Sequence, residues 1–156
     1  ITVMNYNKGA SKMIPMLQYA VQFKQLYTKY FQALGEELNL SQTEIDILLF
    51  LRNNPELNTA RDVTAMRGLA RSNVSSAVER LQREGWLRVE PDPGSRRVKR
   101  LVIRNVYEEE MERLAQCQEE CFAAVLRGIS PQEREELGGL FGRLRANIQQ
   151  ALQEMK

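Results

Sequence analysis

The sequence contains no histidine in its 156 residues. Histidine is the commonest metal ligand and the side chain best suited to proton transfer near neutral pH, so its absence disfavours a metal site or a general-base centre. A phosphate-binding glycine loop, a nucleophile elbow and a loop cluster of carboxylates are also missing. We therefore expect a protein that is not an enzyme and that uses no metal or cofactor.

Cysteine is scarce as well, with only Cys117 and Cys121, four positions apart in a stretch of helical periodicity. The disulfide framework of a small secreted protein would need more cysteines. The neighbouring Glu119 and Glu120 would raise the pKa of a thiol, which disfavours a reactive thiolate. Buried structural thiols are the expectation, and the pattern does not decide whether they have a redox role.

Long hydrophobic runs are absent, because no apolar stretch approaches the roughly 20 residues that a membrane-spanning helix needs. No signal-peptide pattern opens the sequence. With 43% hydrophobic and 27% charged residues, the composition is that of an ordinary globular protein. We expect one domain over residues 1–156, a cytoplasmic location and no membrane partner.

The charge that is present is unevenly distributed. Residues 1–57 carry five basic and five acidic side chains. Residues 58–104 carry eleven basic and five acidic side chains, and residues 105–156 carry six basic and ten acidic ones. A basic middle between a neutral and an acidic segment indicates one module that faces phosphates, mounted on a scaffold that does not.

The spacing of apolar residues predicts a mainly α protein with a small β-hairpin (α+β), in the order ααααββαα. Residues 1–10 lack periodicity and suggest an extended arm. The stripe of Met13, Met16, Tyr19, Phe23 and Tyr27 is typical of a core or subunit interface, with an effector cleft as the alternative. The expected helices cover 11–38, 41–54, 59–67, 71–84, 105–127 and 130–155, and the strands 86–90 and 99–103 are joined by a loop over 91–98.

The helix over 71–84 carries the clearest functional pattern. Its apolar residues Val74, Ala77, Val78 and Leu81 recur at helical spacing, so the opposite face is exposed and polar. Arginine suits guanine and asparagine suits adenine in a major groove. We expect Arg71 and Asn73 to read bases, Ser72, Ser75 and Ser76 to reach bases or phosphates, and Arg80, like Arg83, to touch backbone or pair with Glu79 or Glu84.

The tip and the returning strand of the hairpin that follows carry four basic residues. Arg96 and Arg97 at its tip fit a narrow, electronegative minor groove, and Lys99 and Arg100 fit phosphates. The alternative is a set of ordinary surface arginines. Likewise, the polar face of the preceding helix could be a solvated face used for protein contacts.

Together these residues resemble the MarR (multiple-antibiotic-resistance regulator) family of bacterial transcription regulators. The resemblance covers nearly the whole chain in element order and is sharpest over residues 40–104. It rests on Asp62-Val63 with Met66, Gly68-Leu69, Arg71-Ser72-Asn73-Val74-Ser75, Val78-Glu79-Arg80-Leu81, Glu84-Gly85-Trp86-Leu87 and Arg96-Arg97 with Leu101 and Ile103.

The resemblance implies a homodimer in which residues 1–38 and 105–156 form a helical dimerisation layer. Residues 39–104 would form a winged helix-turn-helix that binds a pseudo-palindromic operator in double-stranded DNA. It further implies a repressor released by a small apolar or phenolic effector. The alternative is a winged-helix protein-interaction or architectural module without a specific operator.

Three positions depart from the family pattern. Ala70 stands where a serine usually caps the recognition helix. The loss of such a cap lowers the stability of the protein by about 1 kcal/mol. Ser95 replaces the aspartate that usually precedes the wing arginines and orients one of them. Ile103-Arg104 replaces a Leu-Thr pair, with Asn105 as the expected substitute cap for the next helix.

Overall fold

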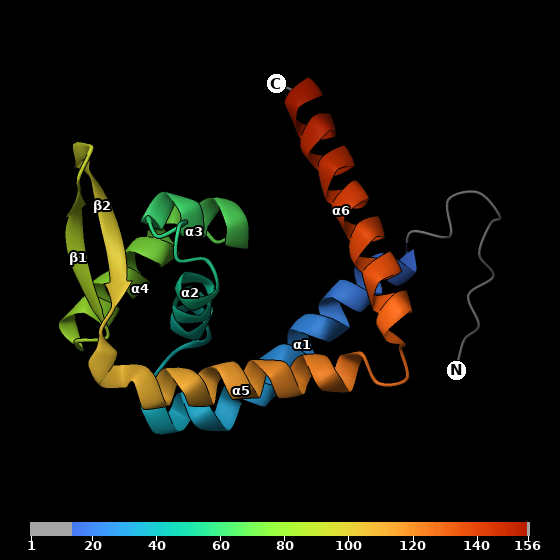
Figure 1. Ribbon diagram of the computed structural model, residues 1–156, viewed down its shortest axis with the longest axis horizontal. Helices are drawn as coiled ribbons and strands as arrows, with labels where there is room; N and C mark the ends of the chain where they lie inside the picture. The colour runs from blue at the N-terminus through green and yellow to red at the C-terminus, as the bar shows by residue number, and fades with distance from the viewer. Residues whose placement is uncertain (1–13, 156) are drawn as a thin grey trace. The chain divides into compact units, whose positions relative to one another are not determined.

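The structure, a computed structural model, describes residues 14–155 (Figure 1). The arm expected over residues 1–10, and Met13, lie outside this range. The chain forms helices and two antiparallel strands in the predicted order ααααββαα, with one additional 3₁₀ turn. The elements are α1 (Ile14–Leu38), α2 (Gln42–Asn53), α3 (Ala60–Arg67), α4 (Arg71–Arg83), β1 (Leu87–Asp92), β2 (Ser95–Ile103), η1 (Asn105–Tyr107), α5 (Glu108–Val125) and α6 (Pro131–Glu154).

The chain divides into two compact units that meet within α5, the first ending at Cys121 and the second beginning at Phe122. None of the helices in the described range combines the length and apolar character needed to cross a bilayer.

Helix α2 forms the centre of the first unit. Six consecutive or near-consecutive apolar side chains on it are buried, so the helix is enclosed on almost every side rather than along one stripe. Helices α1, α3 and α4 and strand β2 all contact it. An enclosed helix shows no amphipathic period, so residue spacing alone does not mark the whole of this surface as core. The buried residues are Ile45, Ile47, Leu48, Leu49, Phe50 and Leu51.

Capping boxes begin three of the helices, at the starts 41, 59 and 130 that the sequence predicts. In each, the Ser or Thr side chain accepts from the N3 backbone N–H and the N3 carboxylate accepts in return. The pairs are Ser41–Glu44, Thr59–Asp62 and Ser130–Glu133. Helix α4 begins at Ala70 with no side-chain cap, again as expected. The expected cap at Asn105 is wrong, because the chain enters η1 there and the turn's N-cap is Arg104 without a side-chain hydrogen bond.

Helix α5 is attached to α1 and to the winged part by specific contacts. Arg113 makes a two-pronged pair with Glu37 (2.7 and 2.8 Å), and Arg52 of α2 donates to the Met111 carbonyl (2.9 Å). At its start, the Trp86 and Tyr107 rings stack with centroids 4.0 Å apart. The two arginines hold α5 against α1 and α2, and the stacked rings hold the base of the hairpin near the start of α5.

The two cysteines are unpaired thiols within this helix. Cys121 is fully buried, and Cys117 is half-buried with its Sγ 3.2 Å from the Tyr30 carbonyl oxygen. Burial raises the pKa of both thiols, and the charge of Glu120 raises that of Cys117 further. Both thiols are therefore mainly protonated near neutral pH, as expected for structural cysteines.

Candidate nucleic-acid interface

Helix α4 presents one apolar and one polar face. Val74, Ala77, Val78 and Leu81 are buried against the rest of the first unit, which confirms the predicted inner face. The predicted outer residues Arg71, Ser72, Asn73, Ser75 and Ser76 are all exposed, and none has a side-chain hydrogen bond within the described range. This face therefore offers donors and acceptors that no intramolecular partner occupies.

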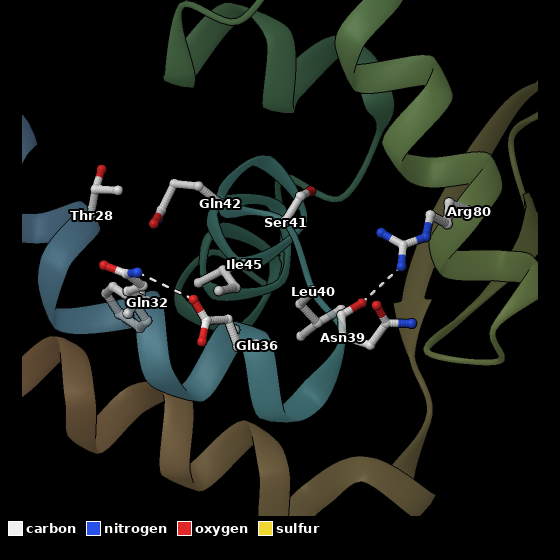
Figure 2. A pocket seen from close by; sticks show the side chains of 11 residues that line it. Thr28, Gln32, Glu36, Asn39, Leu40, Ser41, Gln42, Ile45 and Arg80 are labelled. Carbon is white, nitrogen blue, oxygen red and sulfur yellow. Dashed lines mark hydrogen bonds between the residues drawn. The ribbon is translucent and has the colours of Figure 1, made fainter.

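Arg80, at the edge of the same helix, is engaged inside the protein. Its Nη1 donates to both carboxylate oxygens of Glu44 (2.8 and 3.1 Å), and its Nη2 donates to the Asn39 carbonyl (2.8 Å). Figure 2 shows the guanidinium reaching from α4 toward the turn between α1 and α2. The expected partners Glu79 and Glu84 are wrong for Arg80. Arg83 does lie beside Glu84, at 3.9 Å and largely in solvent.

The hairpin is longer than the sequence predicted. Its strands run to Asp92 and from Ser95, so only Pro93 and Gly94 remain at the turn instead of a loop over 91–98. The Asp92 carboxylate closes this turn by accepting from the Gly94 N–H (2.9 Å). The difference arises because a side chain, rather than a run of alternating hydrophobic residues, holds the outer part of the hairpin together.

The two tip arginines lie on a bulge of β2. Pro91 pairs with Lys99 and Asp92 pairs with Ser95, so Arg96, Arg97 and Val98 have no counterpart on β1. A bulge bends the strand and redirects its side chains. Arg96, Arg97 and Lys99 are exposed, so this part of the hairpin presents positive charge to solvent.

Arg100 has a different environment from its basic neighbours. Its Nε donates to Asp92 (2.6 Å) and its Nη1 donates to the Asn58 side chain (2.8 Å), while the Leu101 N–H donates to the Asn58 carbonyl (2.7 Å). The hydrogen bond from Arg100 lowers the pKa of the Asp92 carboxyl. The hairpin is therefore tied to the segment that leads into α3 (Figure 1).

The structure thus brings most of the predicted residues onto the exposed side of α4 and the hairpin, and separates two from the rest. Arg80 and Arg100 are occupied by intramolecular partners that sequence reasoning missed. No local pattern could reveal Glu44, which is 36 positions from Arg80, or Asn58, which is 42 from Arg100. The pairing of Asp92 with Arg100 could have been considered from the hairpin, had its register been known.

The described residues hold no group of three or more histidine, cysteine, aspartate or glutamate side chains placed to bind a metal ion. The arginine, asparagine and serine side chains and the positive charge on this surface are of the kinds that contact bases and phosphates.

The profile of the MarR family matches residues 38–98, which run from the end of α1 to the bulged part of β2. The sequence matches no curated protein at a significant level.

Solved structures share the fold at low sequence identity. A MarR family transcriptional regulator of Silicibacter pomeroyi is 23% identical, with a TM-score of 0.70 over 86% of this chain and 89% of that one. BpsR of Bordetella bronchiseptica, whose DNA binding is regulated by 6-hydroxynicotinic acid, is 17% identical. The match has a TM-score of 0.68 and covers 90% of this chain and 97% of that one. A MarR family regulator of Listeria monocytogenes, solved with a 26-mer DNA, is 17% identical. The match has a TM-score of 0.75 and covers 85% of this chain and 87% of that one.

Proposed function

We propose that this chain, whose residues 38–98 match the profile of the MarR family, is a homodimeric, sequence-specific DNA-binding regulator of that family. Members of the family are DNA-binding transcription factors rather than enzymes, in agreement with the expectation from the missing catalytic motifs. Its target would be a pseudo-palindromic operator, because a two-fold dimer presents the same reading surface to each half-site.

The exposed face of α4 is the observation that carries the proposal. Arg71 and Asn73 lie in its first turn, where a recognition helix meets base edges. In the proposed complex they read guanine and adenine, and Ser72, Ser75 and Ser76 contact bases or phosphates. The Listeria monocytogenes relative solved with DNA supports this use of the fold.

The hairpin supplies the second contact. Arg96 and Arg97 would enter the minor groove from their bulge, and Lys99 would contact phosphate. Arg80 and Arg100 would not contact DNA in this scheme. We assign them to positioning, Arg80 for α4 and Arg100 for the hairpin, because their guanidinium groups are held by Glu44 and Asp92.

Exposed apolar side chains support the homodimer. Helix α6 buries no residue, and its large apolar side chains, 41–58% exposed, recur every three or four positions along one stripe. Such a stripe in water marks an association surface. Its members are Leu140, Phe141, Leu144, Ile148 and Leu152. The start of α1 exposes Leu17, Tyr19 and Val21 in the same way.

Regulation by a small molecule and repression of transcription are the further parts of the proposal. The Bordetella bronchiseptica relative, whose DNA binding responds to 6-hydroxynicotinic acid, supports a ligand-responsive regulator. An effector acts by binding one conformation of the dimer better than another. A protein that controls transcription in this way would work in the cytoplasm.

Selection of bound fragments from the source genome tests the proposal. The full-length protein should enrich fragments with a two-fold related motif, and it should prefer that motif over random duplex at raised salt, where purely electrostatic binding fades. The double variant Arg71→Ala/Asn73→Ala should lose the preference while it keeps weak general DNA binding. Enrichment without any shared motif would instead favour an architectural or protein-interaction module.

A further inference from the structure

A series of polar side chains joins four helices inside the first unit. The hydroxyl of Tyr27, on α1, accepts a hydrogen bond from the Gln118 amide of α5 (2.8 Å), and the oxygen of that amide accepts from Asn53 at the end of α2 (3.0 Å). Arg67, the last residue of α3, hydrogen-bonds the same hydroxyl and pairs with Asp46 of α2 (3.0 Å). We call these five residues the Tyr27 network.

The central hydroxyl of the network is shielded from water. Tyr27 is 8% exposed, and the side chains of Asp46 and Arg67 are 17% and 33% exposed. Burial raises the pKa of Tyr27, and the hydrogen bonds of Gln118 and Arg67 offset part of that rise, so the hydroxyl is neutral near pH 7. A buried polar group whose partners come from separate helices holds those helices in one arrangement, because a shift of either helix leaves it unsatisfied.

Arg67 lies at the junction between α3 and the recognition helix. Gly68 follows it in a left-handed conformation (φ 62°), which glycine tolerates and which ends the helix. Only Leu69 and Ala70 then separate Gly68 from the start of α4 at Arg71. With so short a connection, a displacement of the end of α3 also displaces the start of α4. The partners of Arg67 therefore contribute to the placement of the recognition helix.

We propose that Tyr27 is a positioning residue for operator recognition, because its hydroxyl ties the helix-turn-helix to α1 and α5. This inference rests on the proposed function. Helices α1 and α5 belong to the expected dimerisation layer, so in the dimer the Tyr27 network sets where each α4 stands relative to its twin. A dimer that reads two half-sites needs this distance fixed, since the half-sites lie about 34–36 Å apart, or a multiple of that, along the DNA.

A consequence of this role concerns half-site spacing. One added base pair lengthens the separation of the half-sites and rotates one of them by about 35° around the DNA axis. A dimer with firmly held recognition helices cannot engage both half-sites after this change, and it loses the gain in affinity that simultaneous binding provides. Loss of the Tyr27 hydroxyl loosens the helix-turn-helix, so the variant protein should accept both spacings.

A thermodynamic cycle tests the network without DNA. Tyr27→Phe keeps the ring and removes only the hydroxyl, and it should lower the folding equilibrium constant, measured with urea at one protein concentration, by about fivefold. The same change should lower it by only about twofold in an Arg67→Met background, where one partner of the hydroxyl is already gone. Arg61→Met, an exposed position on the same helix, is the control background and should leave the fivefold effect intact. A fivefold effect in both backgrounds would overturn the link from Tyr27 to α3.

Operator binding tests the positioning role. The full-length wild type should prefer the selected operator over one with an added central base pair by at least about tenfold, and Tyr27→Phe should reduce this preference to within about threefold. Tyr30→Phe is the matched control and should keep the wild-type preference. Tyr30 lies on the same helix and is half-buried, and its hydroxyl has no side-chain hydrogen bond within the described range.

The ratio of the two affinities separates positioning from general stability, because a destabilised protein would bind both operators more weakly by the same factor. A wild-type ratio in Tyr27→Phe would therefore overturn the proposal while leaving the proposed function intact. A wild type that selects no two-fold related operator would instead count against the proposed function, and the positioning role would be refuted with it.

Discussion

The guanidinium of Arg80 donates to both carboxylate oxygens of Glu44, and Glu44 is the one charged side chain that is buried among the described residues. The same carboxylate accepts the Ser41 N–H (2.7 Å) that closes the cap of α2. One buried group therefore joins the start of the central helix to the recognition helix. The orientation of α4 depends on a contact that lies outside its own sequence.

Removing this contact should destabilise the fold measurably. Arg80→Gln leaves the Glu44 carboxylate buried without an opposite charge, and we expect a loss of about 2–4 kcal/mol in the free energy of unfolding, measured with urea. Glu44→Gln should lower the free energy of unfolding by less, because the amide oxygen of the glutamine can still accept from the Ser41 N–H. The guanidinium of Arg80 is partly exposed and can be hydrated. Arg83→Gln, which breaks only a solvent-exposed pair, should stay within about 0.5 kcal/mol. Equal losses in Arg80→Gln and Arg83→Gln would contradict the bridging role.

The bulged arginines should contribute mainly electrostatic binding. Arg97→Ala should weaken operator binding several-fold and lower the slope of log K against log salt by about 0.9, the value for one phosphate contact. Arg127→Ala, which removes an exposed arginine between α5 and α6, is the charge-matched control and should leave both quantities unchanged. An unaltered affinity and salt slope in Arg97→Ala would remove the hairpin tip from the interface.

The Asp92–Arg100 pair should depend on pH in a defined direction. The pKa of Asp92 is lowered in the folded protein, so the pair stabilises the hairpin above the ordinary aspartate pKa and is lost as the pH falls through the folded value. The NMR titration midpoint of Asp92 should lie below the ordinary value of about 3.9. Arg100→Gln should raise the midpoint toward that value. A wild-type midpoint at or above the ordinary value would refute the pair in solution.

Restoring a cap to α4 should stabilise the protein. The backbone of Ala70 is extended (φ −62°, ψ 137°), as an N-cap requires, so the serine Oγ in Ala70→Ser can accept from the N–H of Asn73. We expect a gain of about 1 kcal/mol in the free energy of unfolding. Ala65→Ser, an exposed position inside α3, is the control and should be slightly destabilising. An unchanged stability in Ala70→Ser would show that the first turn of α4 frays in solution.

The apolar stripe of α6 should control association. Ile148 is 55% exposed, and Ile148→Glu would place a charge within the proposed dimer interface. Sedimentation should show a dimer for the wild type and a monomer for this variant, with a matching loss of operator affinity. Gln149→Glu adds the same charge one position away and should remain dimeric. A wild-type monomer, or a dimeric Ile148→Glu variant, would exclude α6 from the interface.

The starts of three helices and the inner face of α4 could be predicted from sequence because their signals are local. A capping box needs residues only three positions apart, and Ser41, Thr59 and Ser130 all begin helices as predicted. The inner face of α4 follows from helical spacing alone, since one stripe is apolar and the other polar. The failure at Asn105 shows the limit of such signals, because a 3₁₀ turn leaves its side chain without a capping role.

By itself, then, the sequence determined the element order and the polar face that α4 presents, because periodicity and caps act within one turn of helix. Only the tertiary structure decided the length of the hairpin, the bulge at Arg96–Val98 and the occupation of Arg80 and Arg100. These features depend on strand register and on partners tens of residues away. Contacts of this kind form when the chain folds back on itself, and no local pattern encodes which carboxylate an arginine will meet.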